Sequence, residues 1–255
     1  MNKWPSNYLT IQQGSCEWFE VRTGCVTASR VKDAIAKLKK GGESAARRTY
    51  KLELLTELLT GHAVEHYVSL SMDFGTENEP LARAEYELSQ NVEVERIGYV
   101  KHPLIKRSGA SPDGLVGDDG LVEIKVPNTN THLEYFLGEV VPDEYRPQMM
   151  WQMACSGRQW CDFVSYDPRL PREFGLFIVR LERDNKVIAE MERDVELFIS
   201  ELNAMAEKLL KHKHILAGPH LAAVAAHVPV MSAELEAIRK EEAAKEFTRL
   251  YGARE

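Results

Sequence analysis

Apolar side chains recur every three to four residues in several segments, which is the spacing that places them on one face of a helix. The clearest case lies near residue 200, where Ile188, Met191 and Val195 fall in register. Gly61 follows another such segment and is a typical helix stop. The predicted helices span residues 28–38, 45–59, 77–88, 144–155 and 186–210.

The middle of the chain favours strands, because apolar residues there alternate with polar ones or form short buried-type runs. The pair Asp119-Gly120 separates two of these runs and is typical of a hairpin turn. Strands among helices predict an α/β (α+β) fold, with a mixed central sheet flanked by helices. The predicted strands span residues 92–95, 97–100, 107–112, 121–126, 161–166 and 174–181.

The composition changes after Lys211, where an Ala-rich stretch and a charged segment follow the last predicted helix. We therefore expect one main domain over residues 1–211 and a helical C-terminal extension over residues 212–255, whose final helix covers residues 233–250. Nothing in the sequence assigns a role to this extension.

Composition limits the class of protein without naming it. The net charge of −7 argues against a protein that coats DNA over its whole surface, but local DNA contacts remain compatible with it. No apolar run is long enough to span a bilayer, and the first residues lack the apolar core of a secretory signal. The four cysteines form no C-x-x-C pair, so we expect free thiols in a reducing cytoplasm.

The segment from Arg30 to Lys51 is locally basic, with eight Lys or Arg residues against two acidic ones, Asp33 and Glu43. One interpretation is a solvated helix face followed by a Gly-Gly loop. The other is a phosphate-contacting surface that includes Lys39. Composition does not choose between them.

The most informative stretch runs from Ser111 to Lys125 and contains Pro-Asp-Gly, a turn and then Glu-Ile-Lys. Side chains two residues apart on a strand share a face, so Glu123 and Lys125 should point together while their apolar neighbours face a helix. The hairpin should bring Asp113 close to Glu123. Two carboxylates suit Mg²⁺, and an amine beside them suits phosphodiester cleavage. These residues favour a nuclease over a surface strand with an unremarkable Glu–Lys pair.

Several blocks around this stretch resemble the family of phage lambda exonuclease and the YqaJ-like viral recombinases, in the PD-(D/E)xK nuclease superfamily. They occur in the family's order between about Trp18 and about Lys208. The blocks are residues 18–29, Phe74-Gly-Thr-Glu-Asn-Glu79, Ser111-Pro-Asp-Gly114, Glu123-Ile-Lys-Val-Pro127, Tyr145-Arg-Pro-Gln148 and residues 163–169. The resemblance implies a restriction-endonuclease-like fold and says nothing about the C-terminal extension.

The resemblance also implies roles for individual residues. Asp113, Glu123 and the backbone carbonyl of Ile124 match metal ligands, and Lys125 matches a catalytic lysine. The residues that complete the catalytic site by the same matching are Glu79 and Gln148. The residues that match DNA contacts are Arg22 and Ser29, in a 5′-phosphate pocket, and Met72, as a wedge between terminal base pairs.

The activity implied is a 5′→3′ exonuclease on double-stranded DNA that uses two Mg²⁺ ions, with Mn²⁺ as a substitute. It would release mononucleotides and leave a 3′ single strand for recombination. The expected setting is a homotrimeric ring around DNA in the cytoplasm of a bacterial host, phage- or prophage-encoded, with a single-strand annealing protein as partner. The alternatives are an endonuclease of the same superfamily and a non-catalytic DNA-binding scaffold.

Overall fold

The computed structural model describes residues 4–38, 42–64 and 70–211, and only the backbone of residues 70–72 and 210–211. The elements of the first half are β1 (Tyr8–Leu9), α1 (Cys16–Arg22), β2 (Val26–Thr27), the 3-10 turn η1 (Ala28–Arg30), α2 (Val31–Ala34), α3 (Ala45–Thr60), α4 (Leu70–Gln90), β3 (Val94–Glu95), β4 (Tyr99–Lys101) and β5 (Ser108–Ala110). Those of the second half are β6 (Gly114–Val116), β7 (Gly120–Lys125), α5 (Thr129–Gly138), α6 (Arg146–Ser156), β8 (Trp160–Tyr166), η2 (Arg172–Phe174), β9 (Leu176–Glu182) and α7 (Asn185–Lys211).

The strands form two mixed sheets. The smaller sheet has the order β1-β4-β5-β2, and the larger has the order β3-β6-β7-β8-β9. In the larger sheet β7 pairs antiparallel with β6 and parallel with β8, so it is the central strand. The expected fold class is therefore confirmed, although the single central sheet of the prediction is divided into two.

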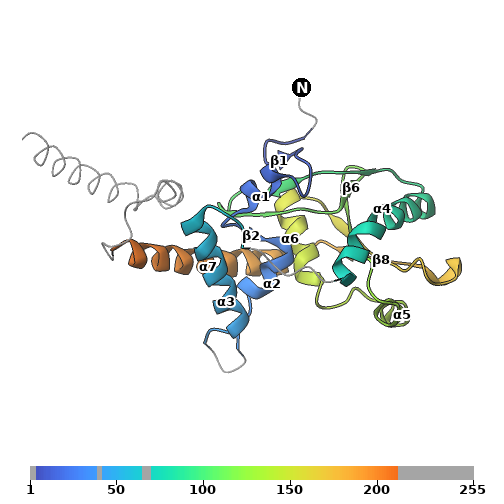
Figure 1. Ribbon diagram of the computed structural model, residues 1–255. Helices are drawn as coiled ribbons and strands as arrows, with labels where there is room; N and C mark the ends of the chain where they lie inside the picture. The colour runs from blue at the N-terminus through green and yellow to red at the C-terminus, as the bar shows by residue number, and fades with distance from the viewer. Residues whose placement is uncertain (1–3, 39–41, 65–69, 212–255) are drawn as a thin grey trace, which may run out of the picture.

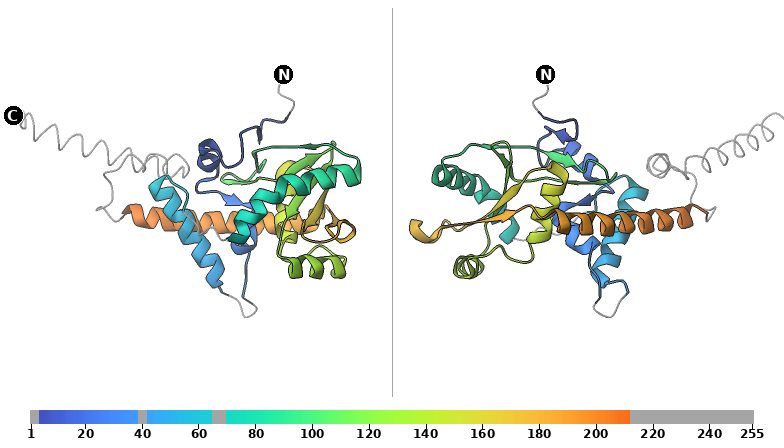
Figure 2. Two further views of the ribbon diagram at one scale, coloured as in Figure 1. Left: turned by 45° about the vertical axis from the view of Figure 1, so that its right-hand side comes forward. Right: turned by 180° about the vertical axis from the view of Figure 1, so that it is seen from behind.

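Each face of the larger sheet packs against a different helix. On one face Val122 and Ile124 of β7 pack with Ala82 and Tyr86 of α4. On the other face the sheet joins the main core, which includes α6 and α7. Figures 1 and 2 show α4 (teal) and α5 (green) at one end of the molecule and α2 and α3 (blue) beside α7 (orange) at the other. The strand that carries the candidate chemistry is thus covered on both faces.

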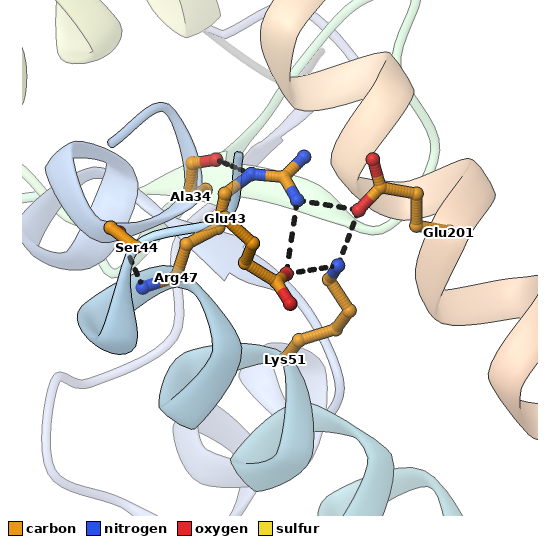
Figure 3. Close-up of polar contacts among 6 residues, drawn as sticks. All are labelled: Ala34, Glu43, Ser44, Arg47, Lys51 and Glu201. Atoms are coloured by element: carbon orange, nitrogen blue, oxygen red, sulfur yellow. Dashed lines mark hydrogen bonds and ion pairs between the residues drawn. The ribbon is translucent and has the colours of Figure 1, made fainter. Parts of the chain in front are cut away.

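Helix α3 is held to α7 by a cluster of four charged side chains (Figure 3). Arg47 and Lys51 of α3 both contact Glu43 and Glu201, and Glu201 belongs to α7. The Lys51 side chain is only 6% exposed. A buried ammonium needs such partners, because an unpaired charge in the interior is strongly destabilising.

Most predicted elements are present at nearly the predicted positions. Helix α3 begins after Ser44, whose Oγ accepts a hydrogen bond from the Arg47 amide at 3.1 Å, and ends at Gly61 with φ of 76°. The predicted helix over residues 28–38 is wrong in length: it is a 3-10 turn and a single helical turn. Helix α4 already includes Leu70, seven residues before the predicted start, and continues through Pro80, because its packing on the sheet outweighs the low helix propensity of Gly75 and Pro80.

The remaining expectations concern the C-terminal extension and membrane-spanning helices. Helix α7 reaches Lys211, the last described residue, so the domain boundary near residue 211 stays a prediction. The predicted helix over residues 233–250 lies outside the described residues. Within the described residues, none of the helices combines the length and apolar character needed to cross a bilayer.

Candidate active site

The β6–β7 hairpin brings the three motif residues together. Residue 114 pairs with residue 122 across the hairpin, so Asp113 lies next to the middle of β7. The Asp113 Oδ2 accepts a hydrogen bond from the Ile124 amide at 2.7 Å. The Lys125 ammonium contacts Glu123 Oε1 and lies 5.2 Å from the centre of the Tyr145 ring. The predicted convergence of Asp113, Glu123 and Lys125 is present in the structure.

Helix α6 adds two glutamines to this group. Gln148 donates from Nε2 to Glu123 Oε1 at 2.6 Å, and Gln152 donates from Nε2 to Glu123 Oε2 at 2.5 Å. The family resemblance implied a role for Gln148 but none for Gln152. The signal was present in the sequence, since residues four apart on a helix share a face.

Burial and neighbouring charges set the electrostatics of the site. Burial first, and then the charges of Glu123 and Glu79, raise the pKa of Asp113 well above its ordinary value, although Lys125 opposes them. Burial alone would lower the pKa of Lys125, but the carboxylates of Glu123 and Asp113 outweigh it and raise that pKa. The site therefore holds excess negative charge that a single ammonium compensates only in part.

Glu79 approaches this group from α4, on the opposite face of the sheet. Its charge acts on Asp113, and its carboxylate contacts the Arg83 guanidinium one turn further along the helix. Glu79 is half-buried. Glu79 thus lies near enough to the site to act on Asp113 electrostatically, and it pairs with Arg83, a partner that the motifs did not indicate. Its role in the catalytic site stays a prediction.

A cationic platform lies beside Asp113. The Arg22 guanidinium stacks 3.9 Å from the centre of the Trp18 ring and donates from Nη1 to Ser111 Oγ at 2.8 Å. Trp18 Nε1 donates to the same oxygen at 2.9 Å. Burial lowers the pKa of Arg22. Ser111 and Asp113 belong to the same Ser-Pro-Asp-Gly motif, two residues apart, so the hydrogen bonds to Ser111 connect Arg22 and Trp18 to the carboxylate site. The sequence did not indicate this connection.

The other predicted DNA contacts have different outcomes. Ser29 is exposed in η1 and lies 3.4 Å from Thr27 Oγ1, and no hydrogen bond joins it to Arg22 in the described part of the chain. Met72 falls within α4, but its side chain lies outside the description, and Lys39 lies outside it altogether.

The basic segment from Arg30 to Lys51 is only partly available to DNA. Arg47 and Lys51 are buried in the ion-pair cluster of Figure 3, so neither interpretation of the segment, a solvated face or a phosphate-contacting surface, holds for these two residues. Arg30 is paired with Asp33 and Glu53. Lys32, Lys37 and Arg48 are exposed, although Lys37 contacts Asp194. Many of these cations hold helices together instead of forming a free basic surface.

The donor atoms at the hairpin fit a hard divalent cation. Asp113 and Glu123 supply carboxylate oxygens, and the Ile124 amide between them donates to Asp113. Lys125 compensates their charge only in part, and the pKa of Asp113 stays raised. Oxygen donors with excess negative charge are what Mg²⁺ prefers. Among the described residues, no three His, Cys, Asp or Glu side chains converge in a geometry that would hold a metal by themselves. Backbone and substrate oxygens would have to complete the coordination.

Comparison with known proteins places the chain in a family. Residues 17–159 match the YqaJ-like viral recombinase domain. An alkaline exonuclease (LHK-Exo) from Laribacter hongkongensis is similar in structure, with a TM-score of 0.74, 48% sequence identity and coverage of 80% of this chain and 100% of that one. A second structure of that exonuclease, in complex with dAMP, matches equally well. No curated protein matches the chain.

A more distant likeness bears on the fold alone. A phage-related exonuclease from Haemophilus somnus 129PT has a TM-score of 0.61 and 14% identity, over 72% of this chain and 96% of that one.

The match to the YqaJ-like viral recombinase domain covers more than half of the chain. The chain therefore belongs to the YqaJ-like viral recombinase domain family, a family of nucleases, and the expected family is confirmed.

Proposed function

We propose that the chain is a DNA exonuclease that removes nucleotides from duplex ends in the 5′→3′ direction with Mg²⁺ as cofactor. The observation that supports this best is the cluster of Asp113, Glu123 and Lys125, with the Arg22 platform beside it. Membership of a nuclease family and the similarity to an alkaline exonuclease support the nuclease class. The complex of that exonuclease with dAMP supports a deoxyribonucleotide substrate.

The proposed chemistry assigns separate tasks to the side chains. Asp113, Glu123 and the Ile124 carbonyl would hold the cation. When bound, Mg²⁺, or Mn²⁺ in its place, supplies an activated water and polarises the scissile phosphate, and two such ions are expected. Lys125 contacts Glu123 and lies 5.2 Å from the centre of the Tyr145 ring, so a phosphate bound at the carboxylates would lie near its charge. Lys125 would then offset the negative charge that develops on the phosphate. Gln148 is half-buried beside it and would orient the attacking water or a phosphate oxygen.

Arg22 is the proposed sensor of the strand end. Only its Nη1 carries a hydrogen bond to a described residue, so its other donors are available to a 5′-phosphate. A guanidinium can bind phosphate through two parallel hydrogen bonds, and the Trp18 ring fixes its plane. Ser29 and Met72 are proposed to contact the end from η1 and α4.

The assay that tests this function compares linear duplex DNA with covalently closed plasmid, in Mg²⁺ and in chelator. We expect the linear DNA to be degraded only with the metal and the closed plasmid to stay intact. Cleavage of the plasmid would favour the rival endonuclease, and binding without cleavage of either DNA would favour a non-catalytic scaffold. A Lys125→Ala variant serves as the inactive control.

The proposal extends to assembly and setting. A homotrimeric ring would explain how an acidic chain stays on DNA, because only the channel needs to be basic. A single-strand annealing protein would take up the exposed 3′ strand, and residues 212–255 are the proposed docking segment. We expect the enzyme to act in the bacterial cytoplasm, where phage or prophage recombination would take place. Pull-down with and without residues 212–255 tests the docking step.

A further inference from the structure

Gln152 lies in the interior directly behind the proposed metal-binding carboxylate, although no motif assigns it a role. It follows Gln148 by one turn of α6 and is only 1% exposed. Its Nε2 donates to Glu123 Oε2 at 2.5 Å, and Glu123 is equally buried. Water is therefore excluded from this contact, which strengthens it electrostatically.

A second buried side chain contacts the other end of the Gln152 amide and supports its orientation. An ionised carboxylate only accepts hydrogen bonds, so the amide must present its NH₂ group to Glu123. The amide oxygen then faces the Cys161 thiol on β8, and Cys161 Sγ donates to Gln152 Oε1 at 3.7 Å. Cys161 is fully buried. The chain Cys161–Gln152–Glu123 thus connects β8, α6 and β7 through directed hydrogen bonds.

The two glutamines differ in what they can reach. Gln148 is half-buried and shares Glu123 Oε1 with Lys125, so it lies on the side of the carboxylate that faces the site. Gln152 contacts the other oxygen, Oε2, from the sealed side. Gln152 therefore has no access to substrate, and any effect it has on cleavage must act through Glu123.

We propose that Gln152, oriented by Cys161, is a positioning residue that fixes the Glu123 carboxylate for cation binding. The proposal rests on the proposed function, since it requires Asp113 and Glu123 to bind the metal. Partners of a ligating carboxylate hold it in the binding orientation, and their loss typically weakens metal affinity by about 10–100-fold. The role differs from simple core packing, which a residue of equal size and no hydrogen bonds would preserve.

The test measures Mn²⁺ binding by calorimetry to the full chain without DNA. Gln152→Met keeps the volume and removes the hydrogen bonds, and we expect it to weaken Mn²⁺ affinity by about 10–100-fold. Cys161→Ala removes the thiol donor and should weaken affinity by up to about 5-fold, because a thiol is a weaker donor than the groups of an ordinary neutral hydrogen bond. Cys161→Ser supplies a hydroxyl donor in its place and should stay close to the wild type. Circular dichroism of each variant confirms folding.

The outcomes separate this inference from the proposed function. If the wild type fails to bind Mn²⁺, or Asp113→Asn binds it equally well, the metal site itself is wrong. If the wild type binds and Asp113→Asn does not, wild-type affinity in Gln152→Met overturns the positioning role alone. Should Gln152→Met not fold, the two Cys161 variants decide, and equal affinity in both would overturn the proposal.

Discussion

Replacing Asp113 by Asn should stabilise the metal-free protein while it abolishes cleavage. Asp113 is half-buried, and burial together with Glu123 and Glu79 raises its pKa well above the ordinary value, against the opposing effect of Lys125. An asparagine oxygen accepts the Ile124 amide just as Oδ2 does at 2.7 Å, and it carries no charge. The substitution thus removes an ionisable group that the fold disfavours and keeps its hydrogen bond.

The sign of the pH dependence follows from the direction of this shift. An unfolded aspartate titrates near pH 4. Because the folded pKa of Asp113 is higher, the stability that its protonated form contributes is complete below about pH 4 and is lost as pH rises through the folded pKa. The Asp113→Asn variant avoids this loss. Its advantage over the wild type should therefore be near zero at pH 4 and grow towards neutral pH.

The size of the stability gain depends on how far the folded pKa of Asp113 differs from its unfolded value, and each pKa unit corresponds to about 1.4 kcal/mol. The raised pKa is the net result after the opposing attraction to Lys125, so we expect Asp113→Asn to gain at least about 1 kcal/mol at pH 7.5 in chelator. For a chain of this size that is a rise of roughly 2–4 °C in melting temperature. Added Mg²⁺ should stabilise the wild type and leave the variant unchanged.

The assay is thermal unfolding of both proteins at pH 4 and pH 7.5, in chelator and in Mg²⁺. A variant that is less stable than the wild type in chelator at pH 7.5 would refute the reasoning. So would a gain of the same size at both pH values, because it would have no link to ionisation.

Three further substitutions test other parts of the account. Lys125→Ala should lower kcat by about 10²–10⁴-fold and preserve DNA binding, measured with Ca²⁺ in place of Mg²⁺; wild-type turnover would overturn its role. Arg22→Ala should lower the preference for 5′-phosphorylated over 5′-hydroxyl ends by about 10–100-fold, and equal losses on both ends would argue against a phosphate pocket. Glu201→Ala should cost about 1–3 kcal/mol of unfolding free energy in denaturant titrations, because Glu43 is then the one carboxylate, among the described residues, that still pairs with Lys51 and Arg47; unchanged stability would show that the cluster of Figure 3 does not hold α7 to α3.

The sequence predicted those features that depend on local spacing. The hairpin at Asp119-Gly120, the shared face of Glu123 and Lys125, and the amphipathic helix α7 follow from periods of two and of about 3.6 residues. The apolar face of β7 packs on α4 as expected. The approach of Asp113 to Glu123 was also predictable, because a short hairpin fixes its own register.

The features that were missed depend on contacts between distant segments. Composition cannot distinguish a solvated lysine from Lys51, which is buried because Glu201 lies 150 residues away in sequence and next to it in space. In the same way, the role of Ser111 depends on a hydrogen bond from Arg22, which lies 89 residues away in sequence. The role of Cys161 depends on the packing of β8 against α6, which brings its thiol to Gln152. The helix after Thr27 is shorter than its pattern indicates, ending in the α2 turn. Tertiary packing decides such cases.

The most direct test of the central claim is digestion of a linear duplex that carries a 5′-phosphate on one strand only, with each strand labelled separately. In Mg²⁺ we expect the phosphorylated strand to be degraded from its 5′ end to mononucleotides while the other strand persists, and no loss of either strand in chelator. Degradation from the 3′ ends, or cleavage that continues without a divalent metal, would contradict the account.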